Sequence, residues 1–293
     1  MTDTDARRAV AGGSASRVKR NRRQWNGSLV VGLVLVAFIV IMALVSFVWT
    51  PYDATRVDTT ARLVGPSASH WLGTDRFGRD IASQLMVGSR TTLFVGIISV
   101  GLAAIIGVPL GIVAGMSGRT TGEFVMRLND LVLAFPSLLL AIMFAAIFGG
   151  STLVAMIAIG IGSVPSYVRL VRSGTLQVMH TEYVLAARVA GRRAIAIGLR
   201  HVLPNVTPLI IVQSSVLFAI AILGEAALSY LGLGTPAPTP SWGRMLQESQ
   251  TLLFQAPLLA VFPGAAIALA VLAFNMLGDG LRDYLDPQLE DRR

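Results

Sequence analysis

Hydrophobic positions gather in long blocks along this chain, and polar segments separate the blocks. An apolar stretch of about 20 residues is long enough to cross a bilayer as a helix. The blocks therefore predict an all-α integral membrane protein with six transmembrane helices. The expected spans are 28–50, 92–116, 131–149, 152–168, 206–224 and 257–278.

The first block could be a cleaved signal peptide or a retained anchor. A signal peptide has a shorter apolar region, followed by a cleavage site of small residues. This block is longer, and Trp49 and Tyr52 follow it. Aromatic side chains of this kind are typical of the membrane–water interface. We therefore predict a retained first transmembrane helix.

Composition supports a membrane protein, because 54% of residues are hydrophobic and only 14% are charged, against about 25% charged residues in soluble domains. The net charge of +8 would suggest a nucleic-acid partner in a soluble protein. Here the arginines are unevenly distributed between alternate polar segments. If both termini are cytoplasmic, 18 of the 24 basic residues are inside and 6 are outside. The positive-inside rule favours this orientation.

The sequence lacks the residues that several kinds of functional site require. The chain has no cysteine, and its only lysine is Lys19 in the N-terminal tail, so a Walker-type phosphate loop is absent. His70, His180 and His201 fall on polar segments of opposite sides, so they cannot share one metal site. A secondary transporter would need ionisable groups within the spans, and these spans carry almost none.

The segment 169–205 is a polar, arginine-rich island between two apolar blocks. Ala186, Ala187 and Ala190 favour a helix here, and Gly191 is expected to end it. Pro204 is expected to close the segment, because the residue before a proline disfavours the helical conformation. The simplest interpretation would be a solvated, positively charged loop.

The spacing within this island is more specific. Ala186-Ala187-x3-Gly191, nine residues, and then His201-x-Leu203-Pro204 resembles the cytoplasmic loop of bacterial ABC-importer permeases. One position departs, since Leu185 stands where that family usually has Glu. Further segments resemble the C-type permease subunit of dipeptide and oligopeptide importers. They are Leu72–Asp80, Met126–Pro136, Leu231–Gly243 and Asn275–Pro287.

The resemblance implies a type I ABC importer permease fold in the bacterial cytoplasmic membrane. It also implies a second permease subunit, two ATP-binding subunits and an extracytoplasmic solute-binding protein as partners. This chain would bind no cofactor, with ATP and Mg on the partner subunits. Its helix before Gly191 would dock on an ATPase. The residues expected to couple to the ATPase are Glu182, Tyr183, Leu185, Ala186, Ala187, Gly191, Arg192, His201 and Pro204.

A related importer for nickel, opines or glutathione stays open, because those permeases share the same motifs. A secondary transporter or channel is a more remote alternative. Polar residues in or beside the fifth span are candidates for the transport pathway, although such groups also bond between helices. They are Gln213, Ser214, Ser215 and Glu225, of which Glu225 could equally be a structural cap.

The expected organisation is a basic cytoplasmic tail (1–27), the first transmembrane helix (28–50), an extracytoplasmic linker (51–90), a permease core of five helices (91–287) with the coupling loop 169–205, and a short cytoplasmic tail (288–293). Asp75 and Asp80 in the linker are expected to form a salt-bridged turn. Gly107, Gly111 and Gly115 recur every four residues, which predicts a surface for close helix contact.

Overall fold

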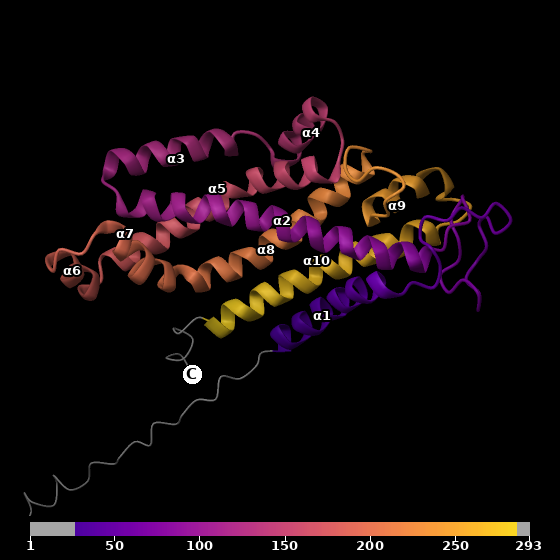
Figure 1. Ribbon diagram of the computed structural model, residues 1–293, viewed down its shortest axis with the longest axis horizontal. Helices are drawn as coiled ribbons and strands as arrows, with labels where there is room; N and C mark the ends of the chain where they lie inside the picture. Colours follow the sequence, from indigo (N-terminus) through magenta and orange to yellow (C-terminus); the bar gives the residue numbers. More distant parts are fainter. Residues whose placement is uncertain (1–26, 286–293) are drawn as a thin grey trace, which may run out of the picture.

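The computed structural model describes residues 27–285, and Figure 1 shows them as an elongated bundle of helices. These residues form ten α-helices, one π-helical turn and one 3₁₀ turn. In chain order the elements are α1 (Gly27–Val48), α2 (Ile81–Met116), α3 (Arg119–Leu133), α4 (Ser137–Phe148), α5 (Thr152–Met179), α6 (Glu182–Val189), α7 (Ala194–Ile197), η1 (Gly198–Val202), α8 (Leu203–Tyr230), α9 (Trp242–Ser249), η2 (Gln250–Leu252) and α10 (Leu258–Leu285). The predicted tails lie outside the described residues, apart from Gly27.

Five helical stretches in this part of the chain are long and apolar enough to cross a membrane, and a sixth span is possible if one bent pair is counted. The all-α membrane fold predicted from the apolar blocks is thus confirmed. The bent pair is α3 and α4, whose axes differ by 75°. The expected third span over 131–149 corresponds to the end of α3 together with α4, and the residues from Arg119 that precede it are also helical.

Proline explains where the third span breaks. Pro136 precedes α4 with an extended backbone (ψ 130°). Proline has no N–H to continue a helix, and it disfavours helical geometry at the preceding residue, Phe135. Leu133 consequently ends α3 two residues earlier. The apolar block is continuous in composition, but its backbone is not.

Other helices extend beyond the apolar blocks from which their spans were predicted. Helix α2 begins at Ile81 rather than residue 92, because Asp80 accepts the backbone N–H of Ser83 as an N-cap. At 36 residues it is about 54 Å long, well beyond a hydrocarbon core of about 30 Å. The linker is therefore shorter than predicted. Between the last two expected spans, 206–224 and 257–278, the chain forms the end of α8 and all of α9.

Pro204 does not close the arginine-rich segment as expected. The chain runs helically from Ala194 to Tyr230, and Pro204 lies in the first turn of α8. A proline within such a continuous helix removes one backbone hydrogen bond and crowds the preceding turn. The preceding turn, Gly198–Val202, is π-helical. A wider turn of this kind accommodates a proline that would clash with an ordinary α-helical turn.

The predicted glycine surface of α2 is confirmed, and its partner is α5. A Cβ atom added at Gly107 would lie 2.6 Å from Cβ of Tyr167, and one at Gly115 would lie 2.6 Å from Cβ of Thr175. Real Cβ atoms do not approach so closely, so only glycine permits this helix separation. Of all pairs of elements, α2 and α5 make the most extensive contact.

Figure 1 shows two distinct ends of the bundle. Helix α6 lies at one end, which we call the α6 end. Residues 49–80, which follow α1, lie at the other, which we call the loop end. Helix α8 runs between them and packs on α10, α2 and α5, so the core lies around α8 with candidate sites at either end.

Candidate coupling and transport sites

Helix α6 ends in a geometry that requires glycine. Gly191 has φ +74°, its N–H donates to the carbonyl of Arg188 at 2.9 Å, and the N–H of Arg192 donates to Ala187 at 3.1 Å. These two bonds form a Schellman motif, in which the residue of positive φ is usually glycine. The prediction that Gly191 ends the helix is confirmed. The turn sends the chain back toward the bundle through α7.

The apolar side chains of α6 point both inward and outward. Val184 is fully buried in a cluster with Val171 and Val202, which anchors the helix. On the outer surface, Tyr183 and Leu185 are nearly half exposed and Val189 is 90% exposed. Exposed apolar side chains gathered on one short element are typical of a contact surface for another protein.

The remaining predicted coupling residues surround this surface. Glu182, Ala186 and Arg192 are exposed, while Ala187 is partly covered. The ring of His201 lies 6.0 Å from that of Tyr183, which brings the second half of the motif against α6. Pro204 is exposed at the start of α8. The structure thus gathers the nine residues predicted from the motif at the α6 end (Figure 1).

Both serines among the four polar pathway candidates bond to their own or a neighbouring helix. The hydroxyl of Ser214 donates to the carbonyl of Ile210 at 2.7 Å and lies 2.6 Å from the hydroxyl of Tyr167 on α5. Ser215 is buried and contacts its own helix at Ile211. Gln213 is half-buried, and its side chain makes no hydrogen bond within residues 27–285. Gln213 therefore has the greatest free capacity to bond a transported molecule.

Glu225 is buried, with 2% of its surface exposed. Its carboxylate accepts hydrogen bonds from the hydroxyls of Ser229 at 2.6 Å and Thr235 at 3.1 Å. The bond from Thr235 ties the end of α8 to the segment that follows it. Of the two alternatives for Glu225, this arrangement favours the structural one over a group at the mouth of a pathway.

A network of charges holds the loop end together. Arg79 forms ion pairs with Asp75 and with Glu248 on α9, and all three side chains are largely buried. The Arg244 guanidinium also pairs with Glu248, at 2.9 Å. The predicted salt-bridged turn is confirmed for Asp75. Its link to Glu248, 169 residues away from Arg79, was not predicted.

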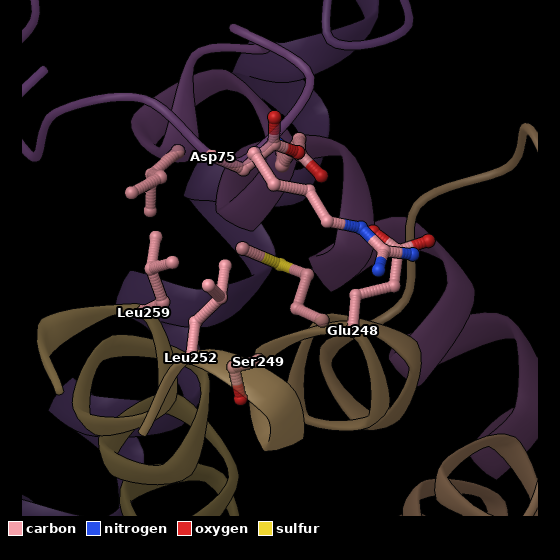
Figure 2. A pocket seen from close by; sticks show the side chains of 9 residues that line it. Asp75, Glu248, Ser249, Leu252 and Leu259 are labelled. Carbon is pink, nitrogen blue, oxygen red and sulfur yellow. The ribbon is translucent and has the colours of Figure 1, made fainter. Parts of the chain in front are cut away.

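Asp80 has a different role from Asp75. It caps α2, and its other oxygen lies 2.9 Å from Nδ1 of His70. A small pocket adjoins the charge network, with Asp75 and Glu248 on its polar side and Leu252 and Leu259 on its apolar side (Figure 2). No group of His, Asp or Glu side chains in residues 27–285 is arranged to hold a metal ion.

Comparison with known proteins agrees with this arrangement. Residues 107–291 match the family described as "binding-protein-dependent transport system inner membrane component". The chain belongs to this family. It is therefore a multi-pass membrane protein and a permease component of a multi-subunit transport system. The match covers the C-terminal end of α2 and all of α3 to α10, and so includes α6 and the π-helical turn.

Individual relatives extend the similarity to most of the chain. The permease DppC of a dipeptide transport system from Alkalihalophilus pseudofirmus is 44% identical over 90% of this chain and 87% of its own length. The permease GsiD of a glutathione transport system from Pectobacterium atrosepticum is 42% identical over 86% and 85%. DdpC from Escherichia coli K12, described as a probable D,D-dipeptide transport permease, is 38% identical over 94% and 96%.

Proposed function

We propose that this chain is one permease subunit of an ATP-driven importer of di- or oligopeptides. It works beside a second permease subunit, two ATP-binding subunits and an extracytoplasmic solute-binding protein. The observation that carries this proposal is α6, a short helix anchored by Val184 with exposed apolar side chains at one end of a membrane bundle. A relative that transports dipeptides supports the cargo.

Transport follows an alternating-access cycle. ATP binding closes the ATPase pair and moves α6, which acts as a lever because it is rigidly packed on α5 and η1. The two permease subunits then open a path toward the binding protein, and hydrolysis resets them. A ligand shifts such an equilibrium only if it binds one state better than the other. The loaded binding protein must therefore prefer one conformation.

Roles for single residues follow from this cycle. Tyr183, Leu185 and Val189 contact the ATPase, and Gly191 with Arg192 sets the exit angle of α6. Gln213 lines the path for the peptide. ATP and Mg are bound by the ATPase subunits, and this chain binds no cofactor. Both termini and α6 lie in the cytoplasm, in agreement with the excess of arginine in those segments.

The docking surface is tested by purifying the tagged chain in mild detergent and identifying the proteins that accompany it. In the wild type, a second permease and ATP-binding subunits are expected. Val189→Asp places a charge on the docking surface and should lose the ATP-binding subunits. Phe254→Asp is the matched control, since Phe254 is fully exposed and lies outside α6. The assignment is contradicted if the Val189→Asp variant still co-purifies with the ATP-binding subunits, or if both variants lose these subunits equally.

Coupling is tested separately by ATP hydrolysis in the reconstituted complex. Proline inside a helix removes a hydrogen bond and costs about 3 kcal/mol, so Ala187→Pro should abolish stimulated hydrolysis while the chain still inserts. Normal stimulation in that variant would refute the lever role. The cargo is decided by which loaded binding protein stimulates the wild type: a peptide-loaded one supports the proposal. Stimulation only by a binding protein loaded with nickel, an opine or glutathione would keep the assignment as an ABC importer but would change the assigned cargo.

A further inference from the structure

An apolar groove runs along α1 and α2 within the part of the bundle that crosses the membrane. Its volume is about 740 Å³, within the range of about 300–1,000 Å³ usual for ligand sites. Val40 and Leu44 of α1 and Phe94 and Ile97 of α2 line it, together with Phe218 and Phe274, whose rings stack at 4.0 Å. A groove of this composition accepts a hydrocarbon chain.

At the loop end, this groove meets a second, more polar hollow. That hollow has a volume of about 620 Å³ and is formed by residues 48–55, Val87 and Arg90. Arg90 lines both spaces, and Asp53 lies in the polar one. The two spaces together therefore have an apolar part and a polar part, with a guanidinium where they join.

Arg90 lies at the level where α1 leaves the membrane. Its Nε donates to the hydroxyl of Ser46 at 2.6 Å, Nη2 donates to the carbonyl of Ser46, and the guanidinium lies 4.1 Å from the centre of the Phe47 ring. Ser46 is only two residues from the end of α1, and Trp49 follows directly. Aromatic residues mark the interface between hydrocarbon and headgroups.

The charge of Arg90 is not neutralised by an acidic group in the described part of the protein. Arginine has five N–H donors, and Arg90 uses two of them, so three remain for a ligand. No carboxylate in residues 27–285 forms an ion pair with Arg90. Asp53 is exposed, and only its Oδ1 accepts hydrogen bonds, from the N–H and hydroxyl of Thr55. These bonds, and to a smaller extent the nearby Arg56, lower the pKa of Asp53, which keeps its carboxylate charged.

We propose that this junction binds a phospholipid whose headgroup carries a primary ammonium, as in phosphatidylethanolamine. The phosphate bonds to the free N–H groups of Arg90, the ammonium faces Asp53, and an acyl chain occupies the apolar groove. An apolar helix of a partner subunit would fill the groove but would leave the Arg90 guanidinium unmatched. The lipid satisfies the apolar and the charged parts together, and it would bridge α1 to α2.

The test is native mass spectrometry of the whole transport complex after reconstitution in nanodiscs of phosphatidylethanolamine and phosphatidylglycerol in equal amounts. The wild type should retain phosphatidylethanolamine preferentially. Loss of one arginine charge at a lipid headgroup should lower retention about fivefold, so Arg90→Gln should retain about a fifth as much. Arg90→Lys keeps the charge and should retain most of the lipid. Asp53→Asn should retain lipid but lose the preference for phosphatidylethanolamine.

The groove is tested without touching the charges. Leu44→Trp fills it and should displace the lipid, whereas Ile41→Trp is the matched control. Both side chains lie on α1 with similar exposure, 61% and 58%, but only Leu44 lines the groove. Equal lipid retention in both variants, or equal retention of the two lipids by the wild type, overturns the proposal. Release of the second permease by Leu44→Trp, with lipid content unchanged, would make the groove a subunit interface and would also overturn it.

Discussion

The contact between α2 and α5 offers a sharp test of how this bundle is held together. At Gly111, an added Cβ would lie 2.7 Å from Cβ of Val171 and 2.9 Å from the carbonyl oxygen of Val168. Neither atom belongs to the flexible end of a side chain, so no rotamer change relieves the clash. Gly111→Ala must therefore separate the two helices, and it disturbs the neighbouring contacts along the whole interface.

Overpacking of this kind costs about 1–3 kcal/mol, so a mid-range value of about 2 kcal/mol lowers the ratio of folded to unfolded protein by about thirtyfold. The assay is equilibrium unfolding of the purified chain in mixed micelles with increasing dodecyl sulfate. Gly101→Ala is the control on the same helix, because nothing lies within 4 Å of its added Cβ. That change should be neutral or stabilise by up to about 1 kcal/mol, since alanine favours a helix over glycine. Equal destabilisation by both variants would refute the packing argument.

Two further predictions concern polar groups. Arg79→Ala removes the shared partner of Asp75 and Glu248 and should lower the free energy of unfolding by about 3 kcal/mol, measured in the same titration. The exposed pair of Arg119 and Glu123 is the comparison, and Arg119→Ala should cost under about 1 kcal/mol; a similar loss in both would contradict a special role for the buried network. Asn129 on α3 is buried, and neither polar atom of its side chain has a partner in the described part of the chain. Asn129→Leu should therefore raise the melting temperature, because it removes a desolvation cost of about 1–3 kcal/mol, and an unchanged or lower value would show that the amide has a compensating partner.

The candidate sites differ in how far the sequence could predict them. The residues predicted to couple to the ATPase, from Glu182 to Pro204, have a local and distinctive spacing, and their gathering at the α6 end follows from one short helix and one continuous one. Pathway residues had only polarity as a signal. Polarity could not distinguish Gln213, with an unused amide, from Glu225, which is enclosed by Ser229 and Thr235.

By itself, the sequence determined the features that depend on neighbouring residues. The length of apolar blocks, the glycine interval of α2 and the positive φ of Gly191 all follow from hydrophobicity, size and backbone freedom within a few turns. Pro136 lies inside the expected span 131–149, but no break was predicted there. The 75° bend between α3 and α4 escaped prediction, because the apolar block 131–149 continues through it without a charged residue.

Only the tertiary structure decided which distant groups meet. Arg79 reaches Glu248 across 169 positions, and Arg90 reaches Ser46 across 44. Neither pair has a spacing that a local pattern could reveal, since helix packing and chain reversals bring the partners together. For the same reason, the junction of Arg90, Asp53 and the apolar groove has no sequence signature. It exists because α1 and α2 pack so that a charge at the membrane boundary lies beside an open hydrocarbon surface.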